Sequence, residues 1–126
     1  MTDLADNMVW LVDDNRSVRD STGAFLEAMG MAVRTHASAL DFLAQFDPDA
    51  RGCVIADYDM PGMTGLELIA VLRGRGSLLP VIVITGRGDA ALEQRVVAAG
   101  GLTMLNKPVD GLELADLVEK TLLKAA

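Results

Sequence analysis

The sequence predicts an α/β domain in which helices cover both faces of a parallel β-sheet. Short apolar runs alternate five times with longer segments of helical spacing, and this alternation is typical of a parallel sheet covered on both sides. The 126 residues suit one domain, for which we expect a core over about residues 8–123. Because aromatic residues make up only 4% of the chain and hydrophobic residues 51%, that core must be largely aliphatic.

Four short runs of mostly apolar residues, and a short strand candidate at Val33–Thr35, mark the strands. Runs that lack polar alternation indicate strands buried on both faces of a sheet. The run that begins at Val81 is the clearest, because Pro80 precedes it and Gly86 follows it. In chain order the predicted strands are Met8–Val12, Val33–Thr35, Cys53–Ala56, Val81–Ile84 and Leu102–Leu105.

Five segments with helical spacing follow these strands. Ser38 and Asp89 can each cap a helix with a side-chain oxygen. Asp110 and Glu113 have the spacing of a capping box, and Gly30 is placed to end the first helix. The predicted helices cover 16–29, 38–46, 66–74, 89–100 and 110–122, with a loop at 58–64 before the third.

Charge and composition exclude several classes of protein. With 18 acidic and 11 basic residues the net charge is -7, which argues against direct binding of nucleic acid. Cys53 is the only cysteine, so no internal disulfide forms, as in proteins of a reducing compartment. We interpret it as a small buried hydrophobe. Met1–Asn7 does not resemble a signal peptide, and no apolar run approaches the ~20 residues of a membrane span. We therefore expect a cytoplasmic protein without membrane contact.

Polar side chains stand at the ends of four of the predicted strands. Right-handed crossovers place the carboxyl ends of parallel strands on one edge of the sheet, where ligands bind in open α/β folds. We therefore expect these side chains to converge although they are distant in sequence. They are Asp13 and Asp14 after the first strand, Asp57 and Asp59 after the third, Thr85 after the fourth and Lys107 after the fifth.

The residue types at this edge suit one chemistry. Carboxylates that crowd together repel one another unless a cation or protons neutralise them, and Mg²⁺ fits best because it takes one or two carboxylates and completes its shell with waters and a phosphate oxygen. A carboxylate such as Asp57 can act as a nucleophile toward phosphorus. The ammonium of Lys107 would neutralise part of the charge, and the hydroxyl of Thr85 could donate to a phosphate oxygen.

Simpler interpretations exist for each of these residues. Asp13 and Asp14 could cap the first helix, Asp57 could begin a loop, Thr85 could merely end a strand, and Lys107 could be solvated. The coincidence of all of them at strand ends favours a shared site. His36 has no partner motif near it, and we do not predict a role for it as phosphodonor or ligand.

From about Val9 to Leu123 the chain resembles the receiver domains of two-component signalling. The resemblance rests on four motifs. The first is the acid pair, and the second is an Asp followed by two residues, Met-Pro, three further residues and Gly. The third is a Thr-Gly pair and the fourth a Lys-Pro pair. It implies a flavodoxin-like three-layer sandwich, a doubly wound (βα)5 fold of strand order 2-1-3-4-5 as in chemotaxis regulators. The motifs stand at Asp13-Asp14, 57–65, Thr85-Gly86 and Lys107-Pro108.

The resemblance also implies roles for individual residues. Asp57 would be the phosphoacceptor and would receive its phosphoryl group from a sensor histidine kinase or a histidine phosphotransfer protein. Asp14 and Asp57 would bind Mg²⁺ directly, Asp13 through water and Asp59 through its backbone carbonyl. Lys107 would pair with Asp57 and then with the phosphoryl group. Such a domain is a signalling phosphoacceptor that assists its own phosphotransfer and dephosphorylation, and not an enzyme.

The resemblance further predicts a switch and a cis bond. Thr85 would move toward the phosphoryl group, together with the residue three before the lysine. That residue is Tyr or Phe in the family and Met104 here, a flexible side chain that can still move. The peptide bond before Pro108 would be cis, as in only about 5–6% of X-Pro bonds. We hypothesise that Arg87 and Asp59 flank the phosphoryl group and set its hydrolysis rate.

Partners and alternatives follow from the same comparison. A downstream effector, or a second copy in a homodimer, would bind the face made by the fourth helix, fifth strand and last helix. A haloacid-dehalogenase-like phosphatase remains an alternative, because Asp57-Tyr58-Asp59, Thr85 and Lys107 fit it loosely. A second alternative is a receiver-like module that works by protein contact without phosphorylation. This alternative stays open because Met104 replaces the aromatic residue that the family carries at this position. A flavin site is disfavoured, because the two aspartates after the first strand would repel the flavin phosphate.

Overall fold

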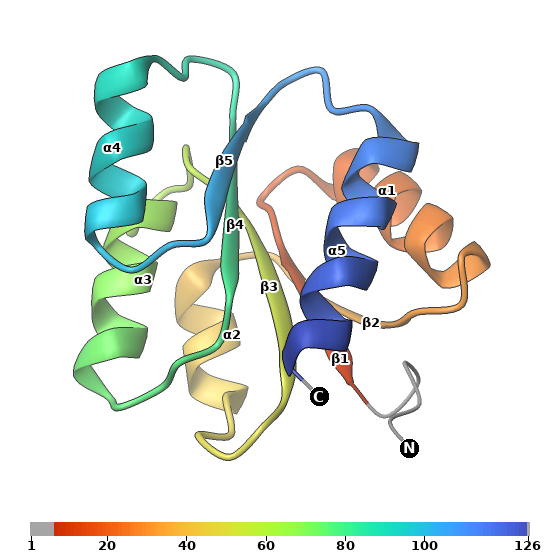
Figure 1. Ribbon diagram of the computed structural model, residues 1–126, viewed down its shortest axis with the longest axis horizontal. Coiled ribbons are helices and arrows are strands. Elements are labelled where there is room, and N and C mark those ends of the chain that lie inside the picture. The colour runs from red at the N-terminus through yellow and green to blue at the C-terminus, as the bar shows by residue number, and fades with distance from the viewer. Residues whose placement is uncertain (1–6, 126) are drawn as a thin grey trace.

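The computed structural model describes residues 7–125. The expectation that Met1–Asn7 is not a signal peptide falls mostly on residues 1–6 and so lies outside the described residues. The strands are β1 (Met8–Val12), β2 (Ala32–His36), β3 (Gly52–Asp57), β4 (Val81–Thr85) and β5 (Thr103–Asn106) (Figure 1). The helices are α1 (Arg16–Ala28), α2 (Ala39–Gln45), α3 (Gly65–Gly74), α4 (Ala90–Ala98) and α5 (Gly111–Ala125).

The five strands form one parallel sheet in the order β2-β1-β3-β4-β5, which confirms the predicted architecture and strand order. The register aligns the carboxyl ends of the strands. Val12 lies opposite His36 on one side and Ala56 on the other, and Thr85 lies opposite Asn106. Because of this alignment, the residues that end β1, β3, β4 and β5 share one edge.

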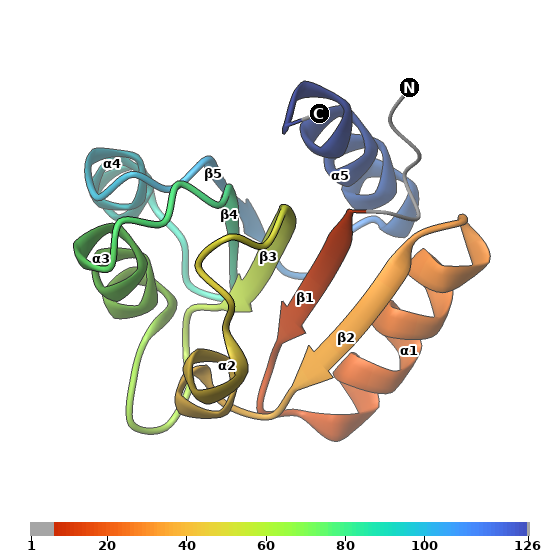
Figure 2. The ribbon, with the colours of Figure 1, turned by 90° about the horizontal axis from the view of Figure 1, so that it is seen from below.

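Helices cover both faces of the sheet, as Figure 2 shows: α1 and α5 lie on one side, and α2, α3 and α4 on the other. Successive β1 side chains therefore enter different cores. Leu11 packs in the cluster that includes α1 and α5 residues, and Val12 in the cluster that includes α2, α3 and α4 residues. Every residue of β3 and β4 is buried. Each such aliphatic side chain contributes roughly 1.5–3 kcal/mol of stabilisation when fully buried.

Side-chain oxygens cap most of the helices. Ser38 caps α2 and Asp89 caps α4, as predicted, and the Asp110 carboxylate accepts hydrogen bonds from two backbone amides in the first turn of α5. The cap of α1 is Asn15, whose side chain accepts from the Val18 amide. The interpretation of Asp13 and Asp14 as the caps of this helix is therefore wrong, although one Asp13 carboxylate oxygen accepts from the Asn15 amide.

Most element boundaries differ from the prediction by one or a few residues, and those of β5, β2 and α1 illustrate the differences. β5 begins at Thr103, one residue later than expected, because Leu102 is 45% exposed and joins the sheet only through a hydrogen bond from its amide to the Val81 carbonyl. β2 extends beyond the predicted 33–35, since all five of its residues pair with β1. α1 ends at Ala28, and Gly30 follows with φ of 92°, a conformation that glycine adopts without strain.

Candidate functional site

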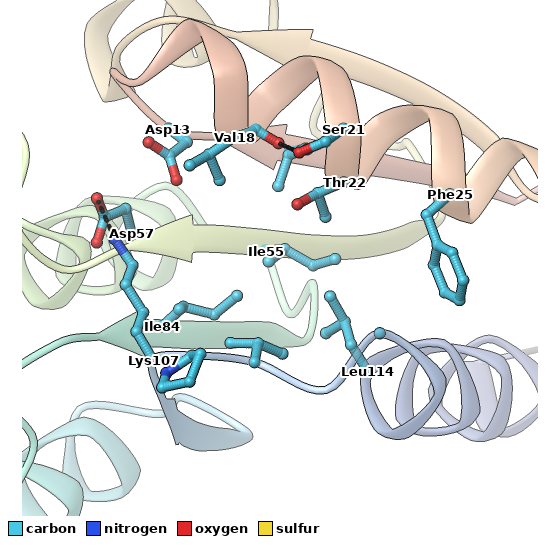
Figure 3. Close-up of a pocket in the computed structure, with 14 residues that line it drawn as sticks. Asp13, Val18, Ser21, Thr22, Phe25, Ile55, Asp57, Ile84, Lys107 and Leu114 are labelled. Atoms are coloured by element: carbon cyan, nitrogen blue, oxygen red, sulfur yellow. Dashed lines mark hydrogen bonds and ion pairs between the residues drawn. The ribbon is translucent and has the colours of Figure 1, made fainter.

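Lys107 and Asp57 form an ion pair at the carboxyl edge of the sheet (Figure 3). The Lys107 Nζ lies 3.3 Å from Asp57 Oδ2. The lysine is held by its backbone, because its amide donates to the Thr85 carbonyl at the end of β4. The Lys107–Pro108 peptide bond is cis. The Lys107 side chain is 38% exposed whereas Asp57 is only 6% exposed, so the ammonium covers a buried carboxylate.

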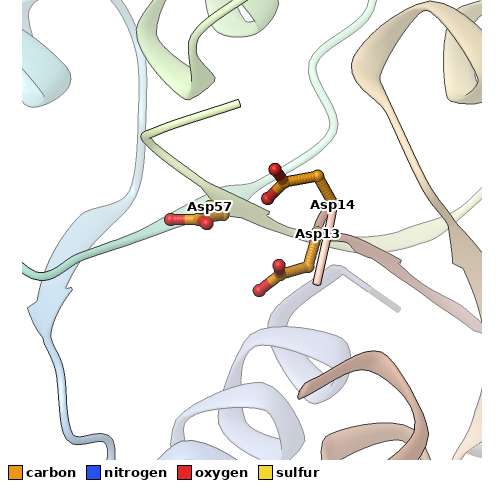
Figure 4. Close-up of side chains that lie close together, drawn as sticks. All are labelled: Asp13, Asp14 and Asp57. Carbon is orange, nitrogen blue, oxygen red and sulfur yellow. The ribbon is translucent and has the colours of Figure 1, made fainter. Parts of the chain in front are cut away.

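Two further carboxylates lie beside this pair, so that three acids meet at the edge of the sheet (Figure 4). Asp13, Asp14 and Asp57 each offer an oxygen, and these three oxygens lie within 4.8 Å of one another. Asp13 and Asp57 are buried, while Asp14 is exposed to solvent. The two strands that supply them, β1 and β3, are neighbours in the sheet. The edge therefore brings together the acids that the sequence places after separate strands.

Hydrogen bonds fix Asp13 from three directions. Its amide donates to the His36 carbonyl at 3.1 Å, which continues the β1–β2 pairing. One of its carboxylate oxygens accepts from the Asn15 amide at 2.8 Å. Its carbonyl accepts from Nη1 of Arg19, on α1, at 2.7 Å. The short segment between β1 and α1 is thereby held with its acids at the edge of the sheet.

Burial and neighbouring charge make Asp57 hard to ionise. Its pKa is raised from the ordinary 3.8, first because the carboxyl is buried and next because Asp13 carries a like charge, whereas Lys107 acts in the opposite direction. Among side-chain atoms of the described residues, Asp57 Oδ1 is buried without a hydrogen-bond partner. A buried acceptor of this kind is costly unless a donor or a cation satisfies it. The site therefore favours a bound positive charge.

These residues fit a hard divalent cation. Carboxylate oxygens are the ligands that Mg²⁺ prefers, and three of them converge with one oxygen unsatisfied. Asp59 is not among these three acids, and its carboxylate lies 2.6 Å from Nη2 of Arg87.

Thr85 and Met104 lie next to each other behind this edge. Thr85 is fully buried, and its hydroxyl oxygen accepts from the Arg87 amide at 3.1 Å. Met104 is buried as well. A Cβ built on Gly88 would come within 2.5 Å of the Met104 methyl carbon and 2.9 Å of the Thr85 methyl carbon. The close approach of the Gly88 backbone therefore encloses the two residues that we expect to form a switch.

His36 has a partner that the sequence did not reveal. Its Nδ1 lies 2.7 Å from Oδ2 of Asp41, in the first turn of α2, and its ring packs edge-on against Phe42. The pair follows from the turn between β2 and α2, which no strand or helix pattern specifies. Cys53 is buried in β3, and burial raises the pKa of its thiol from 9.0 to about 12.

The raised pKa of Asp57 predicts a stability difference between the wild type and Asp57→Asn in metal-free buffer. An acid whose folded-state pKa lies above its unfolded value destabilises the fold once the pH exceeds both values. At pH 7 we expect Asp57→Asn to be more stable than the wild type, because a neutral amide avoids the burial of a charge and the repulsion from Asp13. The gap should close as the pH falls toward 3.8.

Chemical denaturation at several pH values measures this difference. Asp20→Asn is the matched control, because Asp20 is an exposed acid of α1 beside Arg16 and its replacement should leave stability nearly unchanged at every pH. A wild type that is more stable than Asp57→Asn at pH 7 would contradict the electrostatic account of the site.

A 2-1-3-4-5 parallel sheet with three carboxylates and a lysine at its carboxyl edge is the arrangement expected of a receiver domain. The model of the response regulator receiver domain family matches residues 9–119. The chain belongs to this family, and it is thus a receiver domain of two-component signalling systems.

Curated relatives and solved structures agree with this assignment. The chain is 40% identical over 118 residues to the transcriptional regulatory protein FixJ of Azorhizobium caulinodans, covering 94% of this chain and 56% of the relative. It is 39% identical to the transcriptional regulatory protein TdiR of Thauera aromatica, covering 90% of this chain and 50% of the relative. The chain thus spans about half the length of these curated relatives.

The solved structures include FixJ-N, with a TM-score of 0.87, 35% identity and coverage of 100% of this chain and 98% of that one. A CheY-like receiver domain from Methanospirillum hungatei has a TM-score of 0.86 and 25% identity over 94% of this chain and 95% of that one. The likeness therefore covers the whole sheet and both helical layers.

Proposed function

We propose that this domain accepts a phosphoryl group onto Asp57 in a Mg²⁺-dependent reaction, and that its donor is a sensor histidine kinase or a histidine phosphotransfer protein. One observation supports this above all: the buried Asp57 carboxylate keeps one oxygen without a partner, beside two further carboxylates, while its other oxygen faces Lys107. These surroundings support a role for Asp57 as the acceptor of the group, beyond merely beginning a loop. Family membership supports the donor class.

The residues of the site divide the work of phosphoryl transfer. A carboxylate oxygen of Asp57 attacks phosphorus, and the bond from phosphorus to the donor atom breaks, with its electron pair leaving on the donor. Asp14 and Asp57 would bind Mg²⁺ directly, Asp13 through water and Asp59 through its carbonyl, and these residues would thereby bring positive charge to the phosphoryl oxygens. Lys107 would contribute the remaining positive charge at the same group.

Thr85 can serve the phosphorylated state. Its hydroxyl oxygen accepts from the Arg87 amide, and its hydroxyl hydrogen can therefore still be donated to a phosphoryl oxygen. Movement of Thr85 would change the packing of Met104, its neighbour across Gly88. We propose that this pair carries the signal toward the surface made by α4, β5 and α5. A downstream effector or a second copy would bind there.

We propose that the whole chain, 1–126, works as one receiver domain with its core over about 8–123, because both hydrophobic clusters pack against a single sheet. No helix within residues 7–125 has the length and apolar character needed to cross a lipid bilayer. The single cysteine supports a place in a reducing compartment such as the cytoplasm.

Acetyl phosphate, a small phosphodonor, tests the proposed function without a kinase. With Mg²⁺ present, intact mass should show one added phosphoryl group per chain, and without Mg²⁺ it should show almost none. The same samples assayed for phosphate release separate a phosphoacceptor from a phosphatase. Steady turnover of a phosphate ester with no stable adduct would contradict the proposal and favour a haloacid-dehalogenase-like enzyme.

Arg87 and Asp59 are expected to set the lifetime of the phosphorylated state. Their ion pair lies on the loops that follow β4 and β3, beside the phosphoacceptor. Removing Arg87 frees the Asp59 carboxylate, which would then change the polarity and the water access next to the phosphoryl group. We expect Arg87→Ala to alter the half-life of phospho-Asp57, measured by intact mass after the donor is removed.

Arg95→Ala is the matched control for this experiment, because Arg95 is an exposed arginine of α4 on the same side of the molecule. Its replacement should leave the half-life unchanged. Equal half-lives for Arg87→Ala and the wild type would show that the ion pair does not set the lifetime of phospho-Asp57.

A further inference from the structure

A pocket of about 310 Å³ extends from Asp57 along the sheet between α1 and α5 (Figure 3). Its walls are mostly aliphatic and aromatic, and its volume lies at the lower end of the range of small-molecule sites. Figure 3 shows Asp57 and Lys107 at one end and Phe25 and Leu114 at the other. The apolar lining includes Leu11, Phe25, Ile55, Ile84, Val109 and Leu114.

Small side chains on α5 and the segment before it leave this space open. Gly111 and Val109 both line the pocket. A Cβ on Gly111 would come within 3.1 Å of the Phe25 ring, so the ring lies directly over the glycine backbone and bounds the pocket. The sheet residues Ile55 and Ile84 are themselves buried, yet they border the pocket. The pocket therefore reaches the core and is not a shallow surface groove.

The polar end of the pocket carries excess negative charge. Two carboxylates, Asp13 and Asp57, line it together with one ammonium, that of Lys107. Both acids are more than nine-tenths buried, and Asp57 Oδ1 has no partner. An ammonium group would satisfy that oxygen with a charge-assisted hydrogen bond, which is shorter and stronger than a neutral one. A carboxylate or phosphate head at the same place would face two like charges.

We propose that this pocket binds a small amphipathic amine, whose apolar chain lies between α1 and α5 and whose ammonium contacts Asp13 and Asp57. The apolar walls provide burial for the chain, and the two acids select the charge of the head. The amine and Mg²⁺ would need the same carboxylates, so each must weaken the other by the same factor. Only this competition rests on the proposed metal site; binding of the amine does not.

Hexylamine, hexanol and hexanoate test the charge selection, because they share one apolar chain and differ in the head group. Titrations of the metal-free wild type, followed by NMR shifts of the pocket methyl groups, give three dissociation constants. We expect hexylamine to bind at least tenfold more tightly than hexanol, and hexanoate to bind most weakly. Equal affinities for amine and alcohol, or no binding of the amine, would overturn the proposal.

Val109→Phe tests the location, because it fills the pocket from the side of α5. Its matched control is Leu112→Phe, which adds the same ring at a residue that is 67% exposed. Val109→Phe should weaken hexylamine at least tenfold and leave Mg²⁺ affinity within about twofold, while Leu112→Phe should change neither. Thr22→Phe, which fills the pocket from α1, gives a second test if Val109→Phe does not fold. Unchanged amine affinity in a folded filling variant would contradict the location.

A Mg²⁺ titration of the wild type keeps the two proposals apart. Saturating Mg²⁺ should weaken hexylamine at least tenfold. If the amine binds as expected but Mg²⁺ does not bind, the proposed function fails while the pocket assignment stands. If Mg²⁺ binds and the amine does not, the pocket assignment alone fails. If both bind without weakening one another, the ammonium does not contact the metal-binding acids and this inference is wrong.

Discussion

Asp57→Asn is expected to abolish phosphorylation of the domain completely. Asparagine keeps the shape of the side chain but offers no carboxylate oxygen to attack phosphorus. The site around it stays in place, because the two neighbouring acids and Lys107 come from other strands. Incubation with acetyl phosphate and Mg²⁺, followed by intact mass, should show one added phosphoryl group on the wild type and none on the variant.

Asp59→Asn is the matched control for this variant, since it removes a carboxylate two residues further along the same segment. Its side chain faces Arg87 and not the acidic cluster, so we expect it still to accept one phosphoryl group. A phosphorylated Asp57→Asn chain would mean that another residue is the acceptor.

Lys107→Ala is expected to slow phosphorylation by about 100-fold, the usual cost of removing one preorganised group that stabilises charge in a transition state. The Lys107 Nζ lies 3.3 Å from Asp57 Oδ2, and the two groups form an ion pair. Loss of the ammonium should not prevent Mg²⁺ binding, because the substitution removes a positive charge that would repel the metal. The rate is measured by intact mass at timed intervals.

Lys120→Ala provides the comparison, because Lys120 also pairs with an acid, Asp116, but lies on the exposed surface of α5. It should be phosphorylated at the wild-type rate. A Lys107→Ala rate within a factor of two of the wild type would show that the ion pair serves the fold and not phosphoryl transfer.

The sheet was predictable because most of its strands have a recognisable sequence pattern. β1, β3 and β4 are continuous apolar runs, and each is buried on both faces as such runs require. Once the strands are parallel, the convergence of Asp13, Asp57 and Lys107 follows from topology. The order of the strands came from the family resemblance, since periodicity alone does not say which strands are neighbours.

The hydrogen bonds and ion pairs that hold the site in place could not be predicted from sequence patterns. The bond from Arg19 to the Asp13 carbonyl and the pair of Arg87 with Asp59 join residues of different segments, and neither has a fixed spacing in sequence. The cap at Asn15 was hidden because three polar residues in a row could each have supplied it. By contrast, the capping box of Thr64 with Glu67 has a recognisable spacing and could have been predicted.

The apolar pocket was unpredictable for a different reason. It arises where α1 and α5 fail to fill the space above the sheet, and Val109 and Gly111 leave room that larger side chains would occupy. Sequence patterns show which residues face a core, but the volume that remains between two helices depends on how they pack.

The most direct test of the site is an experimental structure with Mn²⁺ in place of Mg²⁺, since Mn²⁺ takes similar oxygen ligands and can be located by anomalous scattering. We predict a single ion at the carboxyl edge of the sheet, bound directly by Asp14 and Asp57, with Asp13 reaching it through water and Lys107 still beside Asp57. An ion elsewhere, or carboxylates that point into separate regions of solvent, would contradict the assignment of Asp57 as the phosphoacceptor.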